Sequence, residues 1–153
     1  MKQKKVRILC AALCVAAVAV LTAGCGGGNK TYKDGTYEGK SEVYINEDEE
    51  STEGNGYGVV NITIKDGKIS DCVYKTYQED GTLKDSEYGK AQGSIANKDF
   101  YNKAQKAVAA ADEYATMLIA NGSLDGIDAI SGATINYNEF VEAVNAALKQ
   151  AEE

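Results

Sequence analysis

The middle of the chain carries the clearest pattern of apolar and polar positions. From residue 60 to residue 65 the two kinds alternate strictly, which places the apolar set on one face of a β-strand. Asp66 and Gly67 come next and favour the type I′ turn that matches the twist of paired strands. The pattern therefore predicts a β-hairpin whose second strand covers residues 68–77.

This second strand has apolar or aromatic residues at both odd-numbered and even-numbered positions. In a regular strand Ile69, Val73 and Tyr77 fall on one side, and Cys72 and Tyr74 fall on the other. We therefore expect both faces of the sheet to be partly covered by helices, with Cys72 buried.

The segment before the hairpin predicts a first strand from about Tyr32 to Ile45, followed by a loop. Residues 46–56 contain five acidic residues among Gly, Ser and Asn. Their spacing does not match the calcium-binding loop of an EF-hand. A solvated, mobile loop is the expected structure.

Two helices are predicted after a polar stretch at residues 78–96. In the first helix, apolar residues recur every three or four positions from a cap at Asn97 to about Ala120. Gly122 suits a left-handed C-terminal cap. The predicted fold class is therefore α+β, a small antiparallel β-sheet with two packed helices.

The second helix is expected to begin near Tyr137 and to carry an apolar stripe toward the end of the chain. Asn136 precedes it, and Glu139 follows three residues later, which is a variant of the capping box. This assignment makes Asn136 the helix cap. The hydroxyl of Thr134 is then left available for other chemistry.

The N-terminus has the layout of a secretory signal peptide. Four basic residues open it, an apolar run follows from Ile8 to Ala23, and the small residues before Cys25 resemble a lipobox. The run is shorter than the roughly 20 residues of a membrane-spanning helix. We expect residues 1–24 to be a lipoprotein signal peptide and residues 25–31 to be the lipidated Cys25 with a flexible tether. The folded domain would then cover residues 32–152, anchored to the lipid bilayer on the extracytoplasmic face of the cell membrane.

Cysteine usage agrees with that expectation. Cys10 and Cys14 would leave with the signal peptide and Cys25 would take the lipid, so Cys72 has no partner for an internal disulfide. The chain has no histidine. Without histidine or paired cysteines, no conventional zinc or haem site is expected.

The charge of the chain excludes one large class of partners. The expected signal peptide contains four of the 16 basic residues and none of the 23 acidic ones, which leaves 12 basic and 23 acidic residues and a net charge of −11. So acidic a surface disfavours nucleic acid, which rewards basic patches. It would also repel free phosphate-bearing dianions.

Residues 128–134 read D-A-I-S-G-A-T and form the chain's most informative stretch. Gly132 gives the backbone conformational freedom, Ala133 adds little bulk, and Thr134 presents a hydroxyl just before the predicted helix. Helix N-termini favour negative charge. A loop with an ordinary cap would explain the composition, but the order of residues indicates more.

The stretch resembles the motif D-x-x-[S/T]-G-A-[T/S] of the FMN-binding domain family. This family includes the flavin subunits of the sodium-translocating NADH:quinone reductase and of the Rnf complex, and small lipoproteins of extracellular electron transfer. The resemblance implies that a flavin transferase uses FAD to join FMN to Thr134 through a phosphoester bond. Asp128, Ser131, Gly132 and Ala133 would then be the recognition sequence.

The resemblance implies a membrane-anchored electron carrier more than an enzyme with its own substrate. A membrane quinol or flavin reductase would be the electron donor. No acid–base pair, nucleophile constellation or metal cluster is evident in the sequence. Tyr88, Tyr101 and Tyr137 are candidates for contact with the flavin ring, and the sequence does not rank them.

Two alternatives stay open at this point. One is a lipoprotein that binds flavin or another small anion noncovalently, as a scavenger or sensor. The other is a structural surface lipoprotein whose cofactor site has decayed. In the first case Thr134 would be dispensable, and in the second the protein would be colourless even when a flavin transferase is present.

Overall fold

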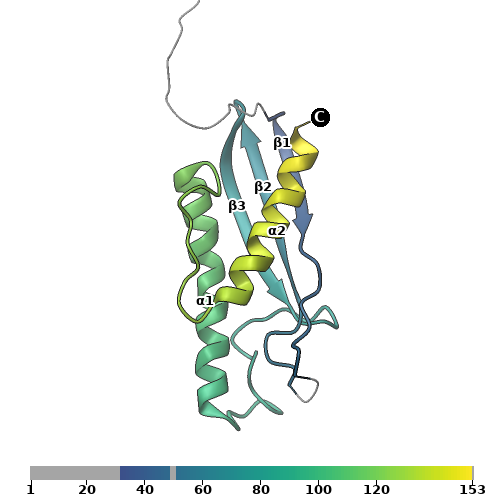
Figure 1. Ribbon diagram of the computed structural model, residues 1–153, viewed down its shortest axis with the longest axis vertical. Helices are drawn as coiled ribbons and strands as arrows, with labels where there is room; N and C mark the ends of the chain where they lie inside the picture. Colours follow the sequence, from purple (N-terminus) through teal and green to yellow (C-terminus); the bar gives the residue numbers. More distant parts are fainter. Residues whose placement is uncertain (1–31, 49–50, 153) are drawn as a thin grey trace, which may run out of the picture.

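Three strands and two helices make up the computed structural model, which describes residues 32–48 and 51–152 (Figure 1). The predicted signal peptide, Cys25 and the tether lie outside the described residues. The strands form one antiparallel sheet in the order β1-β2-β3, which confirms the α+β class. The elements are β1 (Gly35–Lys40), β2 (Tyr57–Lys65), β3 (Lys68–Tyr77), α1 (Lys98–Asn121) and α2 (Thr134–Ala151).

The central hairpin forms as the alternation predicts. Asp66 and Gly67 both adopt left-handed backbone conformations, with φ of 52° and 70°, as a type I′ turn requires. The Asp34 carboxylate accepts a hydrogen bond from the Gly67 N–H at 3.0 Å, and this bond lowers the pKa of Asp34. The turn is thereby tied to the segment that leads into β1.

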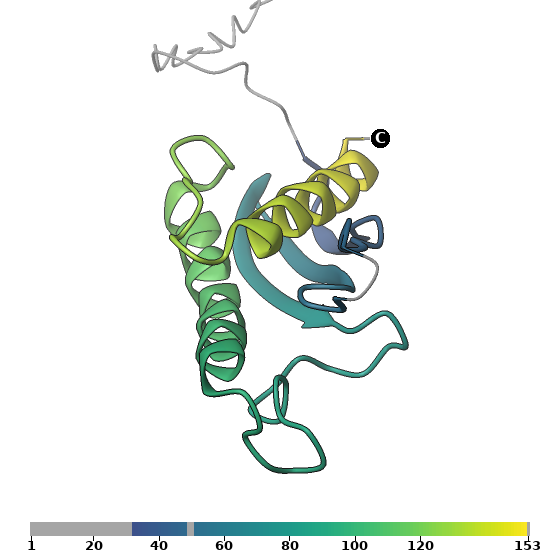
Figure 2. The same cartoon turned by 60° about the horizontal axis from the view of Figure 1, so that its bottom comes forward.

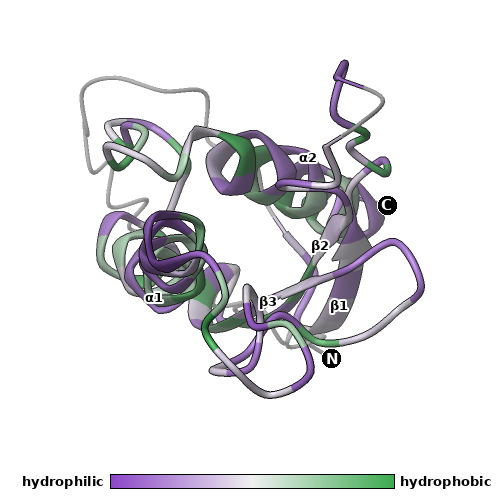
Figure 3. Cartoon of the chain, turned by 90° about the horizontal axis from the view of Figure 1, so that it is seen from below, coloured by the Kyte–Doolittle hydropathy of each residue, from purple (hydrophilic) through white to green (hydrophobic). Residues whose placement is uncertain are grey.

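The expectation that both sheet faces are covered is wrong, because a β-bulge changes the parity of β3. Ile64 pairs with Ile69 while Thr63 pairs with Asp71, so Ser70 is an extra residue. The bulge places Ile69 on the same buried face as Cys72, and Val73 on the opposite face is 46% exposed. Figure 3 shows both helices on one side of the sheet.

The first strand is shorter than expected. It ends at Lys40, and the chain pairs again only at an isolated bridge between Tyr44 and Gly56. Between these points the hydroxyl of Ser41 accepts a hydrogen bond from the Gly58 N–H at 2.9 Å. The Ser41 N–H still donates to the Gly58 carbonyl at 3.0 Å, so the side chain replaces one bond of the strand ladder where the backbone turns away.

The first helix has the ends that the sequence predicts. Asn97 accepts a hydrogen bond from the Phe100 N–H at 3.0 Å, and Gly122, with φ of 69°, donates from its own N–H to the Leu118 carbonyl at 2.9 Å. This helix packs along β3, and its N-terminal part extends past the sheet toward residues 78–97 (Figures 1 and 2).

The second helix crosses β1 and β2, and a layer of aromatic rings fills the space that it shares with α1. Phe140 of α2 stacks on Tyr114 of α1 with ring centroids 5.4 Å apart, and it contacts Tyr74 of β3 at 5.0 Å. All three side chains are buried. The cluster therefore joins both helices to the sheet.

Small residues set how closely α2 approaches the sheet. Ala143 and Ala147 are fully buried against β1 at Gly39. A Cβ atom at Gly39 would overlap the Ala143 carbonyl oxygen, which is backbone and cannot move aside without shifting the helix. Gly39 is therefore required by packing.

We expect Gly39→Ala to destabilise the protein by about 2–3 kcal/mol, because overpacking at a rigid contact costs this much. The free energy of unfolding in urea measures the effect. Glu38→Ala, at the neighbouring exposed position, is the control and should cost less than about 1 kcal/mol. Equal effects of the two substitutions would contradict the packing argument.

Candidate functional site

The loop before α2 makes a tight turn at the candidate motif. The Ala133 N–H donates to the Ile130 carbonyl at 2.9 Å, and Gly132 within the turn has a φ of 83°. L-residues with side chains rarely adopt this conformation, so the turn favours glycine at that position. Ser131 and Gly132 are exposed, whereas Ala133 is buried.

Two tyrosine hydroxyls hold this loop in place. The Tyr114 hydroxyl accepts from the Ile130 N–H at 2.8 Å and donates to the Ala133 carbonyl at 3.3 Å. The Tyr137 hydroxyl donates to the Ile127 carbonyl at 2.9 Å. The loop conformation thus depends on side chains from both helices.

The predicted start of α2 is wrong, and so is its predicted cap. The helix begins at Thr134, its N-cap residue is Ala133, and no side chain caps it. Asn136 is buried inside the first turn, where its amide donates to the Ala107 carbonyl of α1 at 2.7 Å. The residues that resemble a capping box instead face the protein interior, because Glu139 is buried as well.

An uncapped N-terminus leaves backbone N–H groups of the first turn without a side-chain acceptor. These groups and the helix dipole favour an anion. No acidic residue occupies the first turn of α2. Thr134 is exposed at this point, so its hydroxyl lies where negative charge is stabilised.

A cavity of about 320 Å³ opens beside this helix end. Its walls come from residues 132–136, from one side of α1 between Phe100 and Ala107, and from loop residues that include Gly54, Lys84 and Tyr88. Sites for small organic ligands start at about this volume. The described residues thus combine an anion-binding helix end with a pocket.

The structure brings together three of the five motif residues predicted to form the site. Gly132, Ala133 and Thr134 line the cavity, whereas Asp128 and Ser131 are exposed on the loop outside it. This arrangement separates a part of the motif that faces the cavity from a part that faces solvent.

Lysines near the cavity add positive charge to the helix end. The Lys106 side chain lies against Gly132, and a Cβ atom at Gly132 would be 3.4 Å from its Nζ. Lys84 is buried in the cavity wall, and its ammonium donates to the Gly54 carbonyl at 3.0 Å. Lys103 lines the cavity beside Glu53, with 3.4 Å between Nζ and Oε1.

Aromatic rings form another part of the wall. Tyr88 and Phe100 meet edge to face, with ring centroids 6.2 Å apart, and the Tyr88 hydroxyl accepts from the Gly54 N–H at 3.3 Å. Of the three tyrosines considered from the sequence, Tyr88 lines the cavity. Tyr101 and Tyr137 do not, since their hydroxyls donate to backbone carbonyls elsewhere.

A buried carboxylate lies next to this site. Glu139 is 3% exposed, and neither carboxylate oxygen has a hydrogen-bond partner among the described residues. Burial raises the pKa of Glu139 to about 7, Lys84 partly offsets the rise, and Glu142 adds to it. Burial likewise lowers the pKa of Lys84. Burial chiefly, and Glu139 in addition, raise the pKa of the Tyr74 hydroxyl.

These features suit a flat, anionic cofactor such as FMN. The helix end and the lysines match a phosphate, the aromatic and alanine walls match a ring system, and Gly132 leaves room for close backbone approach. Sequence reasoning missed Lys84, Lys103, Lys106 and Phe100, because their approach to the motif depends on the tertiary fold.

A model of the FMN-binding domain matches residues 53–149. The chain belongs to the FMN-binding domain family. It is therefore a flavin-binding protein, with FMN as its cofactor. The matched residues include most of the cavity wall and the whole D-A-I-S-G-A-T motif of this family member.

Solved structures give further likenesses. The crystal structure of the CPE2226 protein from Clostridium perfringens is 25% identical, with a TM-score of 0.55, and the match covers 79% of this chain and 89% of that one. A solution structure of a Clostridium thermocellum protein is 26% identical, with a TM-score of 0.39, over 79% and 93% of the two chains. Among curated proteins, no significant match is found.

Within residues 32–48 and 51–152, no helix is long and apolar enough to cross a membrane. The same residues contain no group of three or more metal-ligating side chains placed to hold a metal ion. Cys72 is buried as expected, and burial raises the pKa of its thiol to about 12.

We expect Glu139→Gln to change how stability depends on pH. A carboxyl whose pKa rises from 4.5 to about 7 on folding stabilises the folded state fully below pH 4.5. That contribution is lost as the pH rises to about 7, and it amounts to about 3 kcal/mol. Urea unfolding at pH 4.5 and 7.5 should show the Gln variant gaining stability relative to the native protein at the higher pH.

Glu113→Gln is the matched control, because Glu113 is exposed on α1 and is not among the groups that shift the pKa of Glu139. Its unfolding free energy should follow the native pH dependence. Parallel curves for Glu139→Gln and the native protein would show that Glu139 has an ordinary pKa.

Proposed function

We propose that this protein is a lipid-anchored, extracytoplasmic electron carrier whose FMN is joined to Thr134 by a phosphoester bond. The observation that carries the proposal is the place of Thr134. It is the exposed first residue of an uncapped helix, and it lines the cavity. A phosphate esterified there would lie at the positive end of the helix dipole.

The attachment follows from ordinary phosphoryl chemistry. A flavin transferase would bring FAD to the motif, the Thr134 oxygen would form a bond to the FMN phosphorus, and the pyrophosphate bond would break with AMP as the leaving group. Asp128 and Ser131 face solvent beside Thr134. This exposure suits recognition by the transferase, whereas Gly132 and Ala133 suit the approach of the phosphate.

Once bound, FMN supplies the redox chemistry, and the protein's residues position it and set its surroundings. Lys84, Lys103 and Lys106 would supply positive charge to an anion held at this helix end and in the cavity. Tyr88 and Phe100 provide an apolar wall that excludes water. No residue is required to act as an acid or nucleophile toward a separate substrate.

The location and partners follow from the N-terminal sequence and the charge. Lipid on Cys25 would hold the protein at the bilayer, where a membrane quinol or flavin reductase delivers electrons. An acidic chain repels free FMN, and a covalent bond removes the need to recapture it after loss outside the cell. A noncovalent flavin-binding lipoprotein is the competing function, and the fate of Thr134 distinguishes the two.

We expect the purified protein, produced with a flavin transferase, to gain the mass of FMN less one water. Its yellow colour should survive denaturation. Thr134→Ala should abolish both the mass gain and the retained colour, as measured by intact-mass spectrometry and visible absorbance. Thr116→Ala, on the exposed side of α1, is the control and should be labelled like the native protein.

Flavin that binds but dialyses away from the native protein would support the noncovalent alternative. A folded protein that stays colourless both with free FMN and with FAD plus the transferase would support a structural role and would contradict the carrier proposal.

A second prediction concerns the fluorescence of the bound flavin and follows from the position of Tyr88 in the cavity wall. Tyr88→Leu should raise the fluorescence of the bound flavin, because a tyrosine ring next to a flavin quenches its excited state by electron donation. Tyr101→Leu changes a tyrosine of the same region that lies outside the cavity wall and should leave the fluorescence unchanged. Equal emission from both variants would place the flavin ring away from Tyr88.

A further inference from the structure

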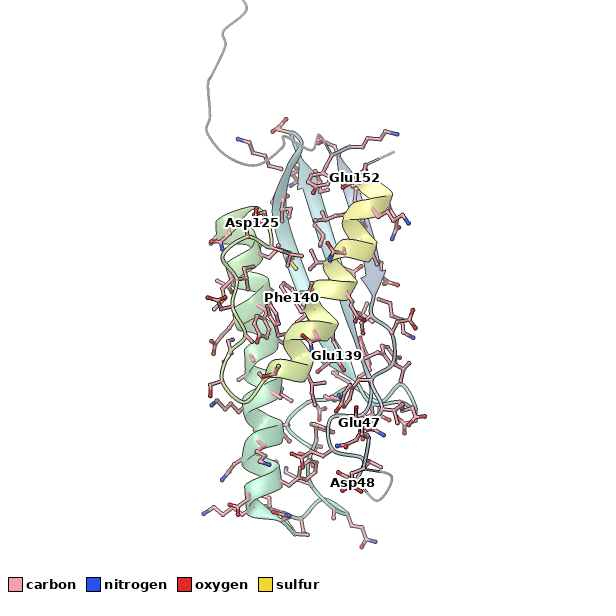
Figure 4. The ribbon with its side chains drawn as sticks, viewed as in Figure 1. Glu47, Asp48, Asp125, Glu139, Phe140 and Glu152 are labelled. Carbon is pink, nitrogen blue, oxygen red and sulfur yellow. The ribbon has the colours of Figure 1, made fainter. Side chains whose placement is uncertain are left out.

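Glu139 is the most unusual charged group in the described residues. It lies on α2 next to Phe140 (Figure 4) and is 3% exposed. Its two oxygens accept no hydrogen bond from any described residue. A buried carboxylate without donors is costly when ionised, so its presence requires an explanation beyond packing.

The position of Glu139 relates it to two cavities. On one side, Lys84 and Tyr88 line the FMN cavity, and both interact electrostatically with Glu139. On the other side, Glu139 itself lines a separate cavity of about 220 Å³ together with Glu42 and Glu142. Glu139 therefore interacts with two wall residues of the first cavity and itself lines the second.

The groups that face Glu139 come from several elements. Tyr74 of β3 donates its hydroxyl proton to the Asn136 carbonyl at 2.8 Å and so does not serve the carboxylate. Lys84 donates to the Gly54 carbonyl. Glu142, one turn further along α2, adds negative charge near Glu139.

Two further neighbours complete these surroundings. Glu42 also lines the second cavity. The backbone N–H of Glu42 donates a hydrogen bond to the Glu142 carboxylate at 3.1 Å. On β2, Gly58 lies against the Glu139 side chain, and a Cβ atom there would be 3.2 Å from the Glu139 Cβ. Lys84 is thus the cation that interacts with Glu139, and it also faces the FMN cavity.

We propose that Glu139 takes up a proton from solvent, through the second cavity, when negative charge enters the FMN cavity. The inference rests on the proposed function. A phosphate or an electron-loaded flavin attracts the Lys84 ammonium, which weakens the stabilisation of the Glu139 carboxylate. The carboxylate and one proton give the neutral acid. The electrons come from the external donor and stay on the flavin.

The coupling is reciprocal. Charge in the FMN cavity raises the proton affinity of Glu139, and protonated Glu139 raises the affinity of the cavity for charge by the same factor. Glu139 does not line the FMN cavity and is thus a positioning residue that acts through Lys84. Its pKa of about 7 before such charge arrives makes the exchange accessible near neutral pH.

The first test follows the Glu139 carboxyl by carbon-13 NMR in the purified protein, without FMN and with FMN attached at Thr134. We expect titration near neutral pH without FMN, and a rise of about one pKa unit when FMN is attached. Lys84→Met should reduce the rise, and Glu113→Gln, at an exposed position on α1, should preserve it. An ordinary pKa near 4.5, or no rise with FMN, would overturn the inference.

The second test measures the reduction potential of the attached flavin between pH 6 and 9. With FMN attached, the pKa of Glu139 is expected at about 8, so above this pH one additional proton per two electrons adds a tenfold change in the equilibrium constant per pH unit, or about 30 mV. Glu139→Gln should lack this added slope, and Glu113→Gln, at an exposed position on α1, should keep it. Identical slopes in the native protein and Glu139→Gln would contradict proton uptake by Glu139.

The two proposals fail in distinguishable ways. If the protein holds no FMN in any form, the proposed function fails, and sulfate then serves as the anionic probe of the cavity in the NMR titration. A rise in the Glu139 pKa with sulfate would support the charge coupling by itself. No rise with sulfate would overturn it.

Discussion

The hydroxyl of Tyr114 is the contact on which the geometry of the candidate FMN site depends. It accepts a hydrogen bond from the Ile130 N–H and donates one to the Ala133 carbonyl, while its ring stacks on Phe140. One fully buried side chain of α1 therefore fixes both the loop and the start of α2. The hydrogen bond from Asn136 to the Ala107 carbonyl secures the same helix end from the other direction. Together these contacts hold an N-terminus without a side-chain cap.

Leaving that helix end uncapped has a cost, and the surrounding structure offsets it. A cap contributes about 1 kcal/mol to a helix. Here α2 gains its stability from burial of Phe140 and from the close packing of its alanines against Gly39. Because tertiary packing holds the helix, its first turn is free to serve a ligand. The same packing sets the direction in which Thr134 faces the cavity.

Local signals predicted much of the fold, and tertiary contacts account for the errors. The turn at Asp66 and Gly67 and both caps of α1 depend on neighbours in sequence, so the sequence predicted them correctly. The start of α2 was misplaced, because Asn136 bonds to a distant carbonyl of α1 and does not cap its own helix. The assignment of β3 side chains to the two faces of the sheet was wrong, because nothing in the sequence around Ser70 indicates the β-bulge there. The motif predicted the cofactor, whereas the lysines near it came together only through the fold.

The charge of the chain and the charge of its cavity act at different distances. The full sequence carries a net charge of −7, yet Lys84 and Lys103 line the FMN cavity and Lys106 lies beside Gly132. Salt screens charges beyond about 8–10 Å, so these lysines and the helix end dominate for a phosphate already in place. The net charge acts mainly during approach, where it lowers the encounter rate with a free dianion. A site that attracts an anion at short range and repels it at long range holds its cofactor best when the cofactor never has to leave, and a phosphoester at Thr134 would meet that condition.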